Sequence, residues 1–329
     1  MSELSEYSAL HNGALVFDRS DRFRIRISGG KAAELVTGMV TNDVGSLQAG
    51  EGQYAAALSA KGKIVADLRI FAMGDSLLID TSPEAAENWR AMVRKYINPR
   101  AAPYHDLSAE VSNLGLFGPS ARKILVQFGL DEKSAAAPYA HVPVTIGVTE
   151  VTVARVPEMD LDGYDLFVPV AAMPSVRETL HAAGALAGSA ETWEIARIES
   201  GRPRWGVDMD ENTLPQEANF DELGAISYTK GCYIGQETVA RIHFRGHVNR
   251  LLRRLRFVAR PSPPRGTELL NDEGKSVGDV RSVALSPRFG GVAIGMVRRE
   301  VAAGTTLRAK WPDGECAVQV EQNEKGATV

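Results

Sequence analysis

A chain of 329 residues, 44% of them hydrophobic and 24% charged, has the composition of a soluble globular protein long enough for two or three domains. Its formal net charge of −4 gives no general reason to bind nucleic acid or an anionic membrane, and we expect neither contact. It has no apolar run of about 18 residues and no secretory signal pattern at its start, so we expect a cytoplasmic protein.

The first hundred residues alternate strand-like and helix-like patterns. The segment FRIRIS, Phe23–Ser28, alternates apolar and polar residues, which is the period of a half-buried strand. The segment 83–97 begins with proline and repeats apolar residues at intervals of three and four, which predicts a helix. Further elements are expected as a helix at 31–40 and strands at 54–58, 63–73 and 77–81, the first two of these strands forming a hairpin.

A second set of mixed elements follows, and then the pattern changes. We expect strands at 109–118, 151–156 and 164–170, and helices at 119–129, 173–184 and 189–201. From residue 251 short strands separated by turn residues predict a small barrel, at 253–259, 267–270, 277–285, 291–297 and 305–311. The order is not a strict strand–helix alternation, so the prediction is an α+β protein with segments 1–107 and 108–246 and a C-terminal β-barrel at 247–329.

One cysteine lies in an unusual stretch, KGCYIGQETVAR. Cys232 and Cys316 are the two cysteines of the chain, too few for a disulfide framework or a four-thiolate metal site, and we expect no metal site. Lys230 precedes the thiol by two residues, and a nearby cation favours the thiolate. A general base would come from His243 or His247, which are close only in sequence. The residues leave two interpretations open, a reactive or sulfur-handling thiol and an inert thiol in a tight turn.

The same stretch closely resembles the signature of YgfZ-type folate-binding proteins. These are bacterial counterparts of a mitochondrial iron–sulfur assembly factor and structural relatives of aminomethyltransferase, the T protein of glycine cleavage. The signature runs Lys-Gly-Cys-aromatic-any-Gly-Gln-Glu, and residues 230–237 meet every position. Likeness to the superfamily extends over 23–44, 62–67, 115–125, 197–218 and 282–297. It implies an aminomethyltransferase-like folate-binding fold, with two α+β segments and a small barrel around a central folate site.

The resemblance implies tetrahydrofolate, or a derivative, as the cofactor. Glu199 matches a glutamate of aminomethyltransferases that accepts two parallel hydrogen bonds from the pterin, and its alternative is a solvated residue at a helix end. Trp205 and Tyr233 are candidate aromatic faces for the rings, or else core residues. Asp67 matches the second member of an acidic pair in the transferases, and the first position holds Ala66, which argues against aminomethyl transfer.

Eight arginines and no acidic residue occur between Thr238 and Thr267. Such a block can hold an anion, such as a folate glutamate tail, a phosphate or RNA. For 253–265 we favour arginines on the barrel surface, paired with acids such as those at 208, 210 and 211. For Arg241 and Arg245, beside the motif, we favour ligand or partner contact.

These features lead to one preferred function and two alternatives. The preferred one is a tetrahydrofolate-binding accessory protein for the maturation or repair of iron–sulfur enzymes, acting through Cys232 and Lys230. Its partners would be folate and iron–sulfur client enzymes or assembly proteins. The first alternative is a tetrahydrofolate-dependent aminomethyltransferase or other one-carbon transferase. The second is a folate domain of an oxidoreductase, which the lack of a flavin-binding GxGxxG segment disfavours.

Overall fold

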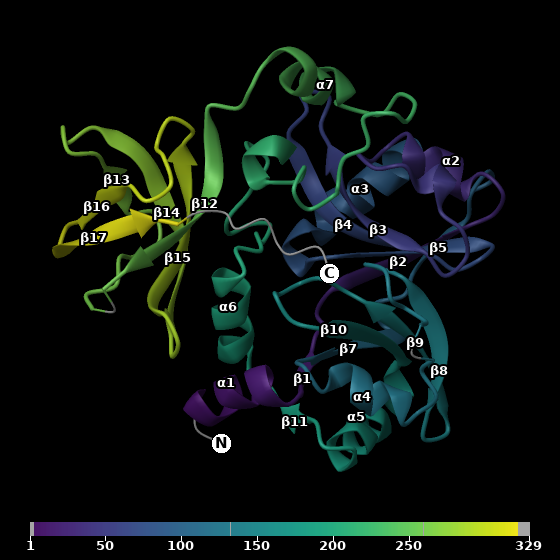
Figure 1. Cartoon of the computed structure of the whole chain (residues 1–329). Coiled ribbons are helices and arrows are strands. Elements are labelled where there is room, and N and C mark those ends of the chain that lie inside the picture. The colour runs from purple at the N-terminus through teal and green to yellow at the C-terminus, as the bar shows by residue number, and fades with distance from the viewer. Residues whose placement is uncertain (1–2, 132, 259, 322–329) are drawn as a thin grey trace.

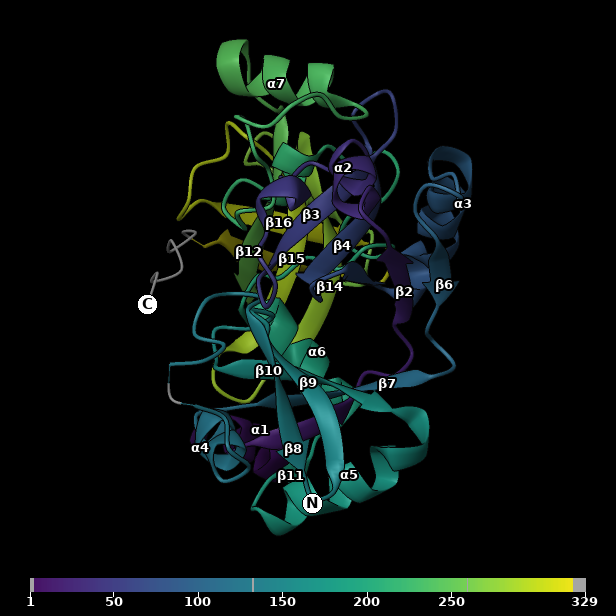
Figure 2. The same ribbon diagram turned by 90° about the vertical axis from the view of Figure 1, so that its right-hand side faces the viewer.

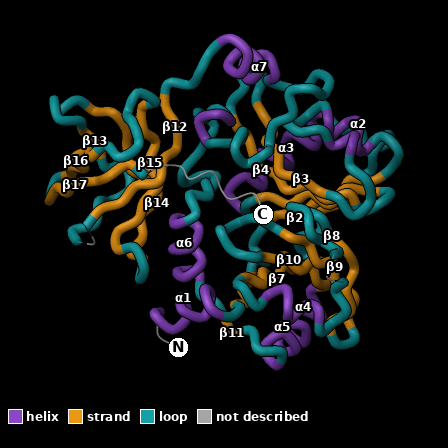
Figure 3. Tube along the Cα trace, viewed as in Figure 1, coloured by secondary structure: helices purple, strands orange, loops and turns teal. Residues whose placement is uncertain are grey.

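The computed structural model describes residues 3–131, 133–258 and 260–321, without the side chains of residues 3 and 4. Two β-sheets with their helices form one side of the molecule, and a barrel forms the other (Figures 1 and 3). Among the described residues, no helix combines the length and the apolar character needed to cross a bilayer.

The first sheet is built entirely from the N-terminal segment. Its order is β3-β4-β5-β2-β6, and every pairing is antiparallel. The strands are β2 Phe23–Ser28, β3 Gly52–Leu58, β4 Ile64–Ala72, β5 Ser76–Thr81 and β6 Tyr104–Asp106. The helical elements of this part are α2 Ala32–Thr37, η1 Val44–Ser46, η2 Pro83–Ala85 and α3 Ala86–Tyr96. The predicted hairpin and the amphipathic helix are confirmed, and α3 buries Trp89, Met92 and Val93.

The second sheet has the order β11-β1-β7-β10-β9-β8. Its strands are β1 Leu15–Asp18, β7 Val111–Phe117, β8 His141–Ile146, β9 Thr149–Arg155, β10 Gly163–Pro169 and β11 Leu186–Ala187. Its helical elements are α1 Glu3–Asn12, α4 Ala121–Val126, η3 Val170–Ala172 and α5 Met173–Ala182. Strand β1 pairs with β7 and β11, so the predicted segment 1–107 contributes a strand to the sheet of the next segment.

The barrel is closed, in the order β12-β15-β14-β13-β16-β17. Its strands are β12 Arg250–Phe257, β13 Glu268–Leu270, β14 Ser276–Ser286, β15 Gly290–Arg298, β16 Thr306–Trp311 and β17 Gly314–Val320. The predicted barrel is therefore confirmed, although the predicted strand 253–259 ended at a residue outside the described part. Strand β17 was not predicted, and it pairs with both β16 and β12 to close the barrel.

Helix α6, Ala190–Glu199, lies between the barrel and the two sheets (Figure 1). It packs against β14 and β15 of the barrel and also against α1, which adjoins it (Figure 1). After α6 the chain passes through η4, Pro215–Ala218, to α7, Gln236–Arg245, which lies on the outer edge of the molecule (Figure 2). Helix α6 therefore lies where the two sheets and the barrel meet, and its side chains can line cavities there.

Candidate functional site

Two cavities lie along α6. The smaller has a volume of about 460 Å³, and α6 contributes Trp193, Glu194 and Arg197 to its wall. The larger has a volume of about 690 Å³ and receives Glu199 and its neighbours from α6. Both volumes fall in the range of small-molecule sites in proteins.

A buried carboxylate lines the smaller cavity. Asp67 on β4 is 9% exposed, and its Oδ2 accepts a hydrogen bond of 2.9 Å from the Tyr54 hydroxyl. Its Oδ1 has no hydrogen-bond partner among the described residues, and neither has the indole Nε1 of Trp205, which lines the same cavity. Burial raises the pKa of Asp67 above its ordinary value of 3.8. An acceptor and a donor without partners are therefore present in one aromatic-walled cavity, where a polar, flat ligand would satisfy them.

Tyr54, whose hydroxyl donates to Asp67, is held in position by the aromatic rings and the guanidinium group around it. It stacks on Phe220 at a centroid distance of 5.1 Å and lies nearly parallel to Tyr139. The Arg202 guanidinium lies 4.3 Å from the centre of the Tyr54 ring and donates to the Tyr139 hydroxyl. Burial raises the pKa of Tyr54 well above its ordinary value, so the hydroxyl keeps its proton and stays a donor to Asp67.

A buried ionic network supports the cavity. Arg69 forms ion pairs of 2.5 Å with Asp80 and with Asp165, and one of 3.1 Å with Glu158. Arg19 forms a second pair with Asp165 at 2.9 Å. These arginines hold the pKa of Glu158 far below its ordinary range despite its burial, so Glu158 is ionised at neutral pH.

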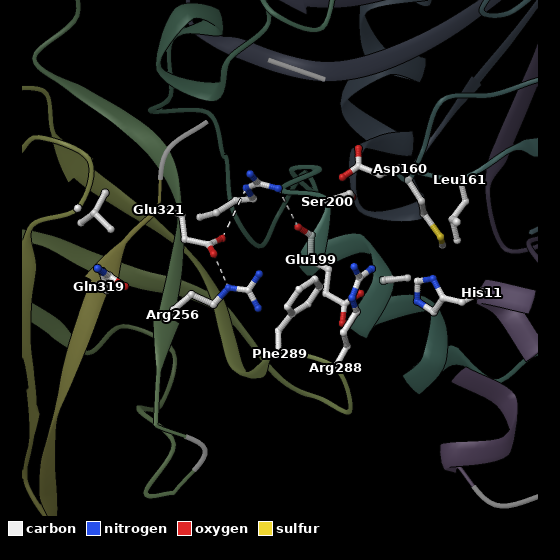
Figure 4. A pocket seen from close by; sticks show the side chains of 15 residues that line it. His11, Asp160, Leu161, Glu199, Ser200, Arg256, Arg288, Phe289, Gln319 and Glu321 are labelled. Atoms are coloured by element: carbon white, nitrogen blue, oxygen red, sulfur yellow. Dashed lines mark hydrogen bonds and ion pairs between the residues drawn. The ribbon is translucent and has the colours of Figure 1, made fainter. Parts of the chain in front are cut away.

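Figure 4 shows the larger cavity, which opens between α6 and the barrel. The Tyr7 hydroxyl lies within hydrogen-bond distance of both carboxylate oxygens of Glu199, at 2.8 and 3.0 Å, and donates to them. The Phe289 ring lies between the guanidinium groups of Arg256 and Arg288. His11 Nε2 and Arg256 Nη1 are buried without a hydrogen-bond partner among the described residues.

The structure separates the residues that the sequence grouped into one site. Asp67 and Trp205 line the smaller cavity, and Glu199 lines the larger one. The motif residues Lys230, Cys232, Tyr233 and Arg241 line neither cavity. Lys230 is half-buried and Tyr233 is buried, whereas Cys232 and Arg241 are exposed. Folate contact by Tyr233 or Arg241 therefore stays a prediction.

The arginine block divides between the barrel surface and the larger cavity. Arg256 forms an ion pair with Glu321, and Arg250 pairs with Glu217 at 2.9 Å. The predicted pairing with Asp208 is wrong, because Asp208 is fully buried and bound to Arg197 on α6 at 2.7 Å. Arg265 instead donates to two backbone carbonyls, those of residues 206 and 207.

Gly235 fixes the motif against the β3–β4 turn. It has φ +81, and a Cβ there would lie 2.5 Å from the Ser59 carbonyl oxygen. We expect Gly235→Ala to lower the free energy of unfolding by about 1–3 kcal/mol, through backbone strain and this collision. Urea unfolding measures the loss. Gly231→Ala is the matched control, because nothing lies within 4 Å of its added Cβ; equal stability of the two variants would contradict the docking described here.

Several residues in or next to the cavities were missed in the sequence. Tyr54 and Arg202 line the smaller cavity, Tyr139 accepts from Arg202 behind it, and Tyr7 binds Glu199, yet none was a candidate. Arg202 lies in the stretch RIESGRPRW that already held Glu199 and Trp205, so its position was a usable signal. Tyr7 comes from a helix that had no distinctive pattern.

Two α+β sheets, a closed barrel and cavities along a connecting helix define an aminomethyltransferase-like architecture. The chain belongs to the glycine cleavage T-protein family, because the model of the GCVT N-terminal domain matches residues 2–226. The model of the glycine cleavage T-protein C-terminal barrel domain matches residues 250–323. The predicted superfamily and fold are thereby confirmed.

Individual relatives agree with this assignment. The chain is 28% identical over 313 residues to a putative chloroplastic transferase of Arabidopsis thaliana, covering 91% of this chain and 69% of the relative. It is 26% identical over 291 residues to an aminomethyltransferase of Nostoc sp., covering 87% and 77%. The crystal structure of the glycine cleavage system aminomethyltransferase T from Bartonella henselae superposes with a TM-score of 0.85 at 22% identity, covering 98% of this chain and 89% of that one. That likeness establishes the fold.

Proposed function

We propose that this protein binds a tetrahydrofolate in the smaller cavity, with Asp67 as the acceptor for the pterin N–H groups. The unpartnered Oδ1 of Asp67 is the observation that carries the proposal. A carboxylate accepts pterin N–H groups by charge-assisted hydrogen bonds, and the aromatic walls offer flat apolar surfaces for the ring. The Trp205 indole N–H, also unpartnered, can donate to a pterin oxygen or nitrogen.

The chemistry that we propose is transfer of a one-carbon unit to or from the folate. Tetrahydrofolate supplies the carrier for that unit. The names of relatives such as the Nostoc aminomethyltransferase support this reading. Asp67 supports it as well, because a buried carboxylate with a raised pKa is suited to hold or release a proton beside an amine. Ala66 in place of a second carboxylate leaves Asp67 to act alone.

A second candidate function rests on a different observation, the exposed thiol. Cys232 lies on the surface and lines neither cavity, so it is accessible to a large partner rather than to a ligand in the cavities. Its KGCYIGQE signature resembles that of YgfZ-type proteins. This candidate is a folate-binding accessory protein for the maturation or repair of iron–sulfur enzymes, with Cys232 as its working group.

Binding and turnover experiments separate the two candidates. Titration calorimetry with (6S)-tetrahydrofolate tests the shared step, and absence of heat and of thermal stabilisation would refute folate binding itself. Production of methylenetetrahydrofolate from an aminomethyl donor, with release of ammonia and of the donor without its aminomethyl group, supports the transferase if Cys232→Ser leaves it unaffected. Folate binding without turnover, together with loss of iron–sulfur enzyme activity in cells that carry only Cys232→Ser, supports the accessory protein.

The predicted role of Glu199 is tested in the same titration. Glu199→Gln keeps the shape of the side chain and an acceptor for Tyr7. A weakened folate affinity in this variant would place the pterin in the larger cavity, whereas an unchanged affinity agrees with the smaller one.

A further inference from the structure

The ammonium group of Lys230 is enclosed by backbone carbonyls. Its Nζ donates to the carbonyl oxygens of Thr37 at 2.5 Å, Val40 at 2.7 Å and Asn42 at 2.8 Å. A lysine ammonium has three N–H donors, so all of them are used. Thr37 is the last residue of α2, where carbonyls lack helical partners and the helix dipole favours a cation. The three carbonyls form what we call the carbonyl cage.

The carbonyl cage is firmly attached to the first sheet. Val40 forms a β-bridge with Ala57 of β3. The Thr41 hydroxyl accepts from the Ala56 amide at 2.8 Å, and the Asn42 side-chain amide donates to the Tyr54 carbonyl at 3.0 Å. The cage is therefore fixed on the same strand that carries the Tyr54 side chain into the smaller cavity.

The turn at 230–234 is attached to this region on both sides of Cys232. Before the thiol, Lys230 enters the cage. After it, the buried Tyr233 ring lies 4.7 Å from Lys230 Nζ, and the Ile234 amide donates to the Gly38 carbonyl at 3.1 Å. Cys232 therefore has an exposed side chain between two attached points of the turn, Lys230 on one side and Tyr233 with Ile234 on the other.

We infer that Lys230 is a positioning residue, whose ammonium group clamps the turn at 230–234 to the carbonyl cage and thereby fixes the orientation of the Cys232 thiol. This differs from the catalytic role predicted from the sequence. An ammonium that already donates to three carbonyls has no N–H left to activate a substrate. It acts through Cys232, on whatever partner that thiol meets, and the inference does not depend on the proposed folate chemistry.

The clamp depends on pH in a specific way. Burial lowers the pKa of Lys230 to about 8, and Asp43 opposes this shift. Tyr233, whose pKa is raised to about 12, stays neutral in this range. Above about pH 8 a neutral amine has two N–H groups for three carbonyls, so the turn loosens. The unfolded chain keeps the ordinary lysine value of 10.5 and binds more protons between these pH values, so this titration does not lower the free energy of unfolding. The expected change is confined to the turn.

A spin label on Cys232 tests the clamp. A Cys316→Ser background leaves Cys232 as the single thiol, and electron paramagnetic resonance then reports the mobility of the label. We expect an immobile label at pH 7 and a mobile component that grows as the pH rises through about 8. Lys230→Met should give the mobile spectrum at both pH values, and Lys61→Met, which removes an exposed lysine from the β3–β4 turn, should behave as the background protein.

Two outcomes overturn the inference. One is a Lys230→Met label as immobile at pH 7 as that of the background protein. The other is a background label that is already mobile at pH 7, a measurement that stands even if Lys230→Met fails to fold. Circular dichroism at both pH values confirms that the fold is intact, so that a mobile label reports the turn alone.

Discussion

Arg69→Met is expected to lower the free energy of unfolding by about 3–5 kcal/mol, because it leaves buried carboxylates without their main counter-ion. Arg69 is 1% exposed and pairs with Asp80, Asp165 and Glu158. Methionine fills a similar volume, so the loss is mainly electrostatic. Urea unfolding at neutral pH, followed by circular dichroism, measures it.

The pH dependence distinguishes this loss from a packing defect. The arginines lower the pKa of Asp80 and of Glu158 from ordinary values of 3.8 and 4.5. A lowered carboxyl pKa stabilises the fold above the ordinary value, and that contribution is lost as the pH falls below it. The deficit of Arg69→Met should therefore be largest near pH 7 and shrink below about pH 4.5. A deficit that is independent of pH would show that packing, and not charge, is responsible.

Arg90→Met is the matched control. Arg90 on α3 also pairs with two carboxylates, those of Glu87 and Asp106, but Arg90 is partly exposed and both carboxylates are exposed. Ion pairs of this kind contribute about 0–1 kcal/mol, so the variant should stay near the wild type. A comparable loss in both variants would contradict the special role of the buried network.

Regular elements could be predicted where a buried face leaves a clear apolar period in the sequence. The alternation in Phe23–Ser28 and the apolar spacing in α3 follow directly from burial on one side. Strand β17 escaped prediction because none of its first four residues is buried, and burial begins only at Val318. Helix α7 escaped because it buries only Val239 and is preceded by a glycine in the left-handed conformation.

The contact between Tyr54 and Asp67 shows why the site was harder to predict than the fold. A regular hairpin paired from Leu58 and Ile64 would place Asp67 opposite Ala55, on the other face from Tyr54. A bulge next to Leu58 shifts the register by one residue, so that Asp67 pairs with Ala56 and shares a face with Tyr54. One extra residue in β4 thus brings Asp67 and Tyr54 together on the cavity wall. The sequence contains no pattern that predicts this bulge.

The motif was informative about the family, but the structure places it apart from both cavities. A compact signature suggested that its thiol stands beside the bound ligand. In the fold, Gly235 docks on the turn between β3 and β4, whereas Asp67 lies further along β4, on the cavity. A strand rises by about 3.3 Å per residue, so the length of β4 between the turn and Asp67 separates the motif from the cavity. The resemblance made candidates of Asp67 and Trp205, which are far apart in the chain but line the same cavity, and their sequence separation alone would not have grouped them.

Asp67→Asn is expected to weaken tetrahydrofolate binding by about 10–100-fold while leaving the protein at least as stable at pH 7. Hydrogen bonds to a charged group contribute about 1.5–3 kcal/mol, and each 1.4 kcal/mol changes affinity tenfold. Asparagine still accepts the Tyr54 hydroxyl, so the cavity wall is kept. Because burial raises the Asp67 pKa, the ionised side chain costs stability above that pKa, and the neutral amide removes the cost.

The pH dependence of binding gives the same prediction a second check. Only the ionised carboxylate accepts two pterin N–H groups, so wild-type affinity should rise with pH through the raised Asp67 pKa, above 3.8, and then level off. Asp67→Asn should show no such rise. Asp21→Asn is the control, because Asp21 lines the same cavity but is exposed. If calorimetry shows equal folate affinity for wild type and Asp67→Asn across this pH range, the pterin does not bind at Asp67, and the larger cavity around Glu199 becomes the site to test.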